Sequence, residues 1–239
     1  MNLTAVTYAD RPDLRHRADV DALADVWPEF LLHDATVNAH YGRVRDGHPG
    51  FQILLLDGDL AIAEGSTIPV AWDGTPQARG VDWALDTGSL DGTPTTLCAL
   101  EAKISPAYHG RGLSRVLLEH MVGLARDHGL DCLIAPVRPT LKHLYPLISI
   151  DRYITWRRDD GQLFDPWLRT HERLGAELLG PCPESMRVEG DVAAWEEWTG
   201  LVFPEDGRYV VDRALVPVVF EGDAGLYVEP NVWMRHPVE

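Results

Sequence analysis

The sequence predicts a single α/β domain, in which helices flank one mixed sheet. Its centre is an extended segment at residues 96–104, a glycine-bearing turn, an amphipathic helix and an apolar strand at residues 130–137. A strand–helix–strand unit of this length implies that its two strands pair in parallel through a right-handed crossover. A hairpin pattern at residues 51–70 adds antiparallel strands, and no linker or internal repeat divides residues 1–239.

Composition and charge argue against several classes of partner. Hydrophobic residues make up 45% of the chain and charged residues 24%, which is typical of a globular protein with a substantial core. The net charge of −16 argues against a nucleic acid or an anionic membrane as partner, because both require a basic surface. No apolar run approaches ~18 residues, so we expect a cytoplasmic enzyme without a membrane span. The three cysteines match neither a disulfide framework nor a zinc site, and we expect no metal.

The first elements are predicted from local patterns. Residues 20–32 carry apolar side chains at helical spacing and predict a helix. An apolar run at residues 51–56, a turn at residues 57–59 and the extended segment Leu60–Val70 predict a hairpin. Pro69 indicates that this second strand lies at a sheet edge or is close to its end.

The helix after the glycine turn has the clearest periodicity in the chain. Arg126 and His128 stand in its last turn, where the helix dipole favours cations, and Gly129 ends it. A short helix at residues 80–85 and turns at residues 73–76 and 91–94 are expected before it. Its apolar stripe consists of Leu113, Val116, Leu117, Met121, Leu124 and Ala125.

The C-terminal part is predicted in shorter pieces. Ser149 is expected to cap a short helix that ends by Gly161. Asp165 followed by Pro166 is a good helix start, and that helix is expected to end at Gly175. Extended pieces are expected at residues 186–188, 214–220 and 226–233, with a helix at residues 194–198 between the first two.

The turn at residues 104–114 predicts an anion site. Unpaired backbone N–H groups and the positive end of the helix dipole point to one spot between the strand and the helix. Gly110 and Gly112 allow phosphates to approach the backbone without meeting a Cβ atom. These features indicate a phosphate-bearing ligand, such as a cofactor.

Residues 97–137 resemble the cofactor-binding core of the GNAT superfamily of acyl-CoA-dependent N-acyltransferases. The family pattern is Gln or Arg, two residues, Gly, one residue, then Gly or Ala. Here Gly112 matches, Ser114 is small enough to fit, and His109 departs from the pattern. The resemblance implies a GNAT-like fold over residues 1–239, with a mixed and mostly antiparallel central sheet splayed between two parallel strands, flanking helices and an insertion at residues 138–164.

The resemblance also implies a cofactor and a reaction. Acetyl-CoA or another acyl-CoA is the expected co-substrate, and an acceptor amine is expected to attack its thioester directly. The backbone of residues 110–114 is expected to hold the pyrophosphate, and the exposed edge of residues 102–104 is expected to pair with the pantetheine. The residues implied in cofactor binding are Ala102, Ile104, Gly110, Arg111, Gly112, Leu113 and Ser114.

Two side chains are candidate catalysts. Glu101 precedes the turn and is either the general base or the partner of Lys103, two residues along on the same strand face. His171 stands where the family often has a tyrosine that protonates the departing thiolate, and imidazole can donate a proton near neutral pH. His171 also shares a helix face with Trp167 and Leu174, so a hydrogen-bonded interior histidine is the alternative.

The acceptor site is expected near two further segments. The insertion at residues 138–164 is interpreted either as an acceptor wall or as a segment that packs over the core. The loop after residues 20–32 borders the acceptor site in the family, and a solvated loop is its alternative. The candidate residues are His143, Tyr145 and Trp156 in the insertion, and His33, Asp34, His40 and Tyr41 in the loop.

The sequence thus predicts transfer of an acetyl or other acyl group from acyl-CoA to the amine of a small-molecule acceptor. The departure at His109 and the missing tyrosine leave two alternatives open. One is an acyl-CoA decarboxylase or hydrolase on the same scaffold, and the other is a non-catalytic acyl-CoA-binding regulatory module. The acceptor, the acyl length and the oligomeric state also stay open, a homodimer being one alternative.

Overall fold

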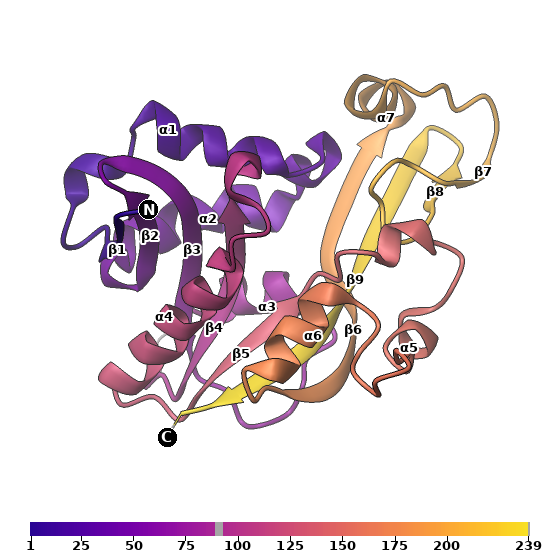
Figure 1. The fold of residues 1–239 in the computed structure, drawn as a ribbon. Helices are drawn as coiled ribbons and strands as arrows, with labels where there is room; N and C mark the ends of the chain where they lie inside the picture. Colours follow the sequence, from indigo (N-terminus) through magenta and orange to yellow (C-terminus); the bar gives the residue numbers. More distant parts are fainter. Residues whose placement is uncertain (89–92, 239) are drawn as a thin grey trace.

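A computed structural model describes residues 1–88 and 93–238 (Figure 1). In this part of the chain the strands form one sheet in the order β1-β2-β3-β4-β5-β9-β8-β7, and β6 also pairs with β9. All pairs are antiparallel except β4 with β5. The strands are β1 (Leu3–Thr7), β2 (Gln52–Asp57), β3 (Leu60–Val70), β4 (Thr96–Ile104), β5 (Cys132–Val137), β6 (Glu177–Asp191), β7 (Gly207–Tyr209), β8 (Val218–Glu221) and β9 (Ala224–Pro237).

Helices cover both faces of the sheet. The stripe of α4 packs on β2, β3 and β4 through Leu117, Met121 and their neighbours, and Trp167 of α6 joins this cluster. On the other face, Val44 of α2 and Leu85 of α3 pack against Cys98 of β4. The helices are α1 (Ala18–Asp21), α2 (Ala35–Gly47), α3 (Gly80–Thr87), α4 (Leu113–Asp127), α5 (Ile150–Tyr153), α6 (Pro166–Arg173) and α7 (Val192–Thr199).

Strands β4 and β5 run in parallel, as predicted, but they pair only at their beginnings. The register joins Leu97 to Leu133 and Cys98 to Ile134, and no later pair of residues is joined. Beyond this point β4 stays with β3, and β5 stays with β9. The sheet therefore opens between two parallel strands at their carboxyl ends, which is the splayed arrangement that the resemblance implied.

A bulge in β4 decides which face its charged side chains occupy. The register with β3 shifts so that Ser66 pairs with Glu101 and Thr67 pairs with Ala99, which leaves Leu100 as the extra residue. Ala99 packs in the cluster on the α4 face, whereas the Glu101 carboxylate accepts a hydrogen bond from Tyr41 of α2. Without the bulge, Ala99 and Glu101 would share one face.

The N-terminal region departs from the expectation of one helix at residues 20–32. Instead α1 is followed by 3-10 turns at Ala22–Val26 and Glu29–His33, because Pro28 adopts an extended conformation and cannot continue a helix. The residues after Asp34 were partly expected as a loop and form α2, whose first turn is capped by the Asp34 carboxylate at 2.9 Å from Val37 N. Strand β1 was not expected.

Downstream, two helix caps are confirmed and one strand is longer than expected. Asp165 Oδ1 accepts hydrogen bonds from the first backbone N–H groups of α6, and Ser149 caps α5. Helix α5 ends at Tyr153, well before Gly161. Strand β6 spans fifteen residues where only residues 186–188 were expected, because Gly180 and two register shifts interrupt its side-chain pattern. Residues 91 and 92 of the expected turn at residues 91–94 lie outside the described residues.

The insertion packs over the core, as one of its two interpretations expected. Ile150, Tyr153 and Leu163 form a cluster with Val137 of β5 and Met234 of β9.

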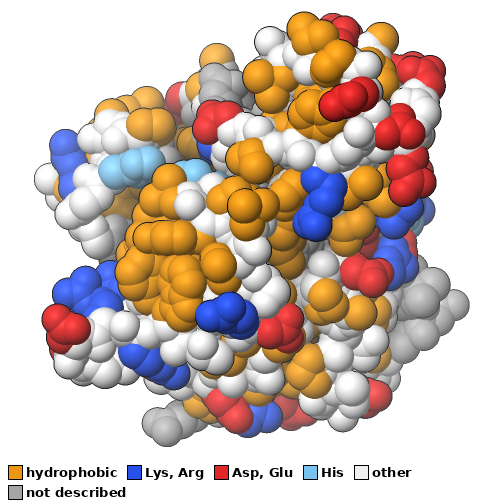
Figure 2. Space-filling model, turned by 90° about the vertical axis from the view of Figure 1, so that its right-hand side faces the viewer, with side chains coloured by type: hydrophobic (Ala, Val, Ile, Leu, Met, Phe, Trp, Pro, Cys, Tyr) orange, Lys and Arg blue, Asp and Glu red, His pale blue; other side chains and the backbone are white. Residues whose placement is uncertain are grey.

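The molecular face that carries α5, β7 and β8 exposes hydrophobic side chains (Figure 2). Within the described residues, no helix is long and apolar enough to cross a bilayer.

Candidate active site

A cavity of about 1090 Å³ passes through the gap between β4 and β5. Its lining includes Met121 of α4 and Trp167 of α6 on one face of the sheet, and Tyr41 of α2 on the other. Residues of the splayed edges, such as Ala102 and Val137, lie between them. The cavity therefore connects the two faces of the sheet, and a ligand that enters on one face can meet a second ligand from the other.

The glycine turn forms one end of this cavity. Gly110 and Gly112 have φ angles of 74° and 77°, in the left-handed region that glycine occupies without strain. Within the described residues, no acceptor is bound to the backbone N–H groups of residues 110–114, and Gly112 begins α4 without a side-chain cap. These donors and the helix dipole fit a pyrophosphate group.

The cofactor residues expected from the sequence gather at this end, with one difference. Ala102, Ile104, Gly110, Gly112, Leu113 and Ser114 all line the cavity. Arg111 does not line it, because its guanidinium group lies over the Tyr108 ring, 4.8 Å from the centroid. The departing residue His109 has a structural contact, since its Nε2 lies 3.0 Å from the carbonyl oxygen of Ile104 and fastens the turn to the end of β4.

We expect Gly112→Glu to weaken CoA binding by at least about 10-fold, because it adds a negative charge beside the anion site. Gly112→Ala is the matched control, since it carries the same left-handed strain without the charge and no described atom lies within 4 Å of a Cβ there. Isothermal titration with CoA measures both variants. Equal affinities for the two variants would show that the turn does not hold a phosphate.

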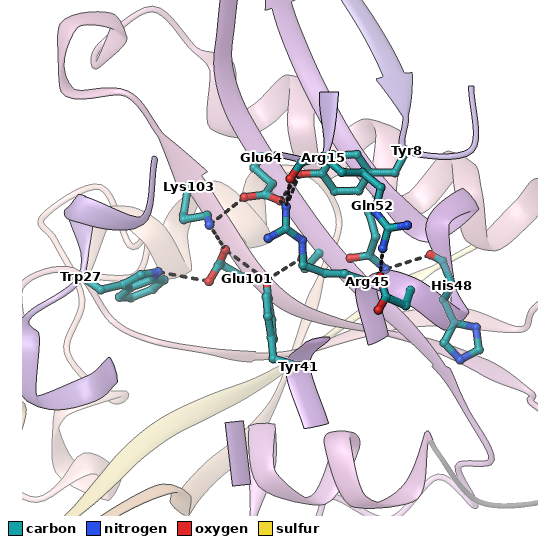
Figure 3. Close-up of polar contacts among 12 residues, drawn as sticks. Tyr8, Arg15, Trp27, Tyr41, Arg45, His48, Gln52, Glu64, Glu101 and Lys103 are labelled. Atoms are coloured by element: carbon teal, nitrogen blue, oxygen red, sulfur yellow. Dashed lines mark hydrogen bonds and ion pairs between the residues drawn. The ribbon is translucent and has the colours of Figure 1, made fainter. Parts of the chain in front are cut away.

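The Glu101 carboxylate lies at the other side of the gap in a network of polar side chains (Figure 3). Lys103 Nζ is 2.6 Å from Glu101 Oε1, so the expected ion pair is present. Tyr41 donates to the same oxygen at 3.2 Å, and Trp27 Nε1 donates to Oε2 at 3.1 Å. Glu101, Lys103, Tyr41 and Trp27 all line the cavity, so Glu101 is both an ion-pair partner and a group that can reach a ligand.

A second carboxylate lies behind this network, away from the cavity. Glu64 of β3 pairs across the strands with Lys103, with 2.7 Å between Oε2 and Nζ. Its other oxygen accepts from the Tyr8 hydroxyl at 2.6 Å, and Arg45 lies 3.4 Å away. Burial lowers the pKa of Lys103, but the Glu101 and Glu64 carboxylates outweigh this effect and raise its pKa, so the ammonium stays charged.

His171 lines the cavity but is buried and hydrogen-bonded. Its Nδ1 lies 2.8 Å from Nε2 of His236, and the Trp167 ring packs against it. Burial, together with the neighbouring His236, holds the pKa of His171 well below its usual value, and burial lowers the pKa of His236 to about 4. A neutral imidazole is a poor proton donor to a thiolate, so this environment favours the interior histidine over the predicted general acid.

The histidine pair predicts a pH-dependent stability. Between pH 6.5 and about 4 the unfolded chain protonates these imidazoles and the folded chain does not, so the free energy of unfolding falls as pH is lowered. For His236, the difference in pKa corresponds to about 3 kcal/mol. Asp82, whose pKa burial raises to about 7, acts in the opposite direction and leaves the total smaller.

Comparison of the wild type with His171→Phe isolates the contribution of His171. Urea unfolding at pH 7.5 and pH 5 is expected to show a smaller loss of stability in the variant than in the wild type. An equal loss in both proteins would mean that His171 is not held neutral by the fold.

The insertion residues divide into two groups. His143 lines the cavity, where its Nδ1 lies 2.9 Å from the carbonyl oxygen of Thr140. Tyr145 and Trp156 do not line the cavity, contrary to the predicted substrate contact. Their rings meet edge to face at 4.9 Å in an aromatic cluster with Tyr153 and Phe164, and both half-buried rings pack against the core.

The sequence interpretation missed a second polar group of lining residues, which we call the β9 wall: Arg138, Arg213, Glu229 and Asn231. Arg138 Nε binds both oxygens of Glu229, at 3.0 and 2.9 Å, and Arg138 Nη2 donates to the carbonyl oxygen of Arg213 at 2.7 Å. Glu229 and Asn231 are two residues apart on β9 and share a face.

Local signals identify some of the missed residues but not others. Val37, Tyr41 and Val44 have helical spacing after the Asp34 cap, and this pattern predicts α2 with Tyr41 directed inward. Nothing local predicts the β9 wall, because Arg138 and Glu229 are 91 residues apart in the chain.

Comparison with known proteins adds a relative and a shared fold. No family model matches the chain. A curated protein from Aspergillus versicolor, named arginine N-acetyltransferase avaD, is 27% identical over 97% of this chain and 93% of its own length.

Two solved structures have a similar fold. The loading GNATL domain of CurA from Lyngbya majuscula has a TM-score of 0.65 at 19% identity, over 99% of this chain and 97% of that domain. The GphF GNAT-like decarboxylase in complex with isobutyryl-CoA has a TM-score of 0.57 at 18% identity, over 100% of both chains. At these identities the likeness concerns the fold and does not assign an activity.

Proposed function

We propose that this chain is a member of the GNAT superfamily of acyl-CoA-dependent N-acyltransferases, and that it transfers an acetyl or other acyl group from acyl-CoA to the amine of a small acceptor. The observation that supports this most directly is the single cavity through the gap between β4 and β5. It joins the anion-binding turn at Gly112 to the carboxylate of Glu101, which are the two groups that such a transfer requires.

The proposed reaction is a direct attack. The acceptor nitrogen bonds to the thioester carbonyl carbon, the C–S bond breaks, and its electron pair leaves on sulfur. Glu101 takes the proton that the acceptor nitrogen loses, and water protonates the thiolate, since His171 is neutral and buried. The unpaired backbone N–H groups on the splayed edge of β4 are positioned to stabilise the oxyanion.

Arginine is the acceptor that we propose to test first. The relative with 27% identity over nearly the full chain is named an arginine N-acetyltransferase. A cationic acceptor is attracted to a protein with a net charge of −16. The Glu101 carboxylate lines the cavity, where it can contact a cationic group of the acceptor.

Release of free thiol from acetyl-CoA, followed with and without L-arginine and other amines, tests the proposal. Release that requires an amine, with acetylated acceptor found by mass spectrometry, is the expected result. Release without an amine would indicate hydrolysis, and loss of CO₂ from malonyl-CoA would indicate decarboxylation. Binding of acetyl-CoA with no turnover would indicate a regulatory module.

A further inference from the structure

The β9 wall carries more positive charge than its own residues neutralise. Arg138 and Arg213 are both guanidinium groups, and Glu229 is the carboxylate between them. Glu229 is fully buried, and both its oxygens are already bound, since Arg138 contacts both and the Tyr227 hydroxyl donates to Oε2 at 2.9 Å. One guanidinium group of the wall is therefore left without an ion-pair partner in the wall itself.

That group belongs to Arg213. Its Nη2 donates to the carbonyl oxygen of Val26, and no carboxylate in the described part of the chain lies within ion-pair distance of it. Its remaining N–H groups can donate hydrogen bonds to a ligand, since Arg213 lines the cavity. Arg213 also has a φ angle of 62°, in the left-handed region that residues other than glycine adopt at a cost in free energy.

Asn231 supplies a second, independent sign of a polar ligand at this wall. Its side chain is 2% exposed and lines the cavity. The amide nitrogen donates to Pro136 O at 3.2 Å and to Ser185 Oγ at 2.8 Å, whereas Oδ1 has no partner among the described residues. A buried acceptor without a partner costs free energy unless a ligand supplies the donor.

We propose that the acceptor is a free amino acid, and that Arg213 binds its α-carboxylate. A guanidinium group and a carboxylate match in geometry and charge, and the pairing gives Arg213 the ion-pair partner that the β9 wall lacks. The Glu101 carboxylate, which also lines the cavity, then faces the cationic part of the same molecule. This inference rests on the proposed transfer reaction and specifies its substrate class.

Binding measured without turnover separates the two proposals. Isothermal titration into the complex with CoA compares L-arginine with arginine methyl ester and with agmatine, which lack the carboxylate. The wild type is expected to bind arginine at least about 10-fold more tightly than either analogue. In Arg213→Gln the affinity for arginine is expected to fall to that of the analogues, whose own affinities stay unchanged.

Arg208→Gln is the matched control, because Arg208 is an exposed residue of β7 outside the cavity and loses the same charge. It is expected to bind like the wild type. Equal wild-type affinity for arginine and both analogues, or an equal loss for all three ligands in Arg213→Gln, would overturn the carboxylate contact. If arginine does not bind, the twenty amino acids are screened for the increase that each causes in the melting temperature of the protein, and the one with the largest increase takes the place of arginine in the titrations. If none of the twenty binds, the proposal is overturned.

These results are independent of turnover. Carboxylate-dependent binding without acetyl transfer would contradict the proposed function alone. Acetyl transfer to amines that lack a carboxylate, with no loss in Arg213→Gln, would contradict the inference alone.

Discussion

Lys103→Met is expected to lower the free energy of unfolding by about 3–5 kcal/mol, the usual cost of removing one partner from a buried ion pair. Lys103 is 6% exposed, and it lies between Glu64 and Glu101 at 2.7 and 2.6 Å. Removal of the ammonium leaves Glu101 without an ion-pair partner and Glu64 with Arg45 as its remaining cation, at 3.4 Å. Their mutual repulsion and lost solvation act in the same direction.

The double variant Lys103→Met/Glu64→Gln is the control for this interpretation. Glu64 is 1% exposed and does not line the cavity, so its neutralisation removes the more deeply buried charge and leaves Glu101 beside the ligand site. Urea unfolding at pH 7.5 is expected to show that the double variant recovers part of the lost stability. A double variant less stable than Lys103→Met would mean that the contacts of Glu64 with Tyr8 and Arg45 outweigh its repulsion of Glu101.

The features that could be predicted from the sequence are local ones. The strand, the glycine turn and α4 are consecutive in the chain. The anion site at Gly112 and the parallel pairing of β4 with β5 can therefore be predicted from rules that act over a few tens of residues. The proximity of Glu101 and Lys103 follows from the two-residue period of a strand. Such local rules predict most of the residues that line the cofactor end of the cavity.

The acceptor side depends on contacts between distant segments. The bulge at Leu100 moves Glu101 to the face of the sheet that α2 covers, and no residue of β4 predicts this bulge. Glu64 reaches Lys103 through strand register, and the β9 wall forms only when β9 lies beside β5. The buried state of His171 depends in the same way on His236, 65 residues later. A single sequence does not specify such pairings, because each depends on the whole sheet.

Glu101→Gln is expected to lower turnover by about 100- to 10 000-fold, the usual contribution of a general base, and to leave the affinity for CoA unchanged. Oε1 of Glu101 is engaged by Lys103 and Tyr41, but Oε2 accepts only from Trp27 among the described residues and can still receive a proton or a hydrogen bond. The amide of glutamine keeps the shape of the side chain and cannot take up the proton of the acceptor nitrogen.

Glu64→Gln provides the matched control, because it makes the same change to the other carboxylate on the same lysine, outside the cavity. It is expected to change stability and to keep turnover within about 10-fold of the wild type, since Glu64 cannot reach a ligand. Steady-state kinetics with acetyl-CoA and the acceptor, and CoA titration, measure both variants. Similar losses of turnover in the two variants would mean that Glu101 acts through its ion pair with Lys103 and not as the general base. Full turnover in Glu101→Gln would mean that Glu101 takes no part in the proton transfer.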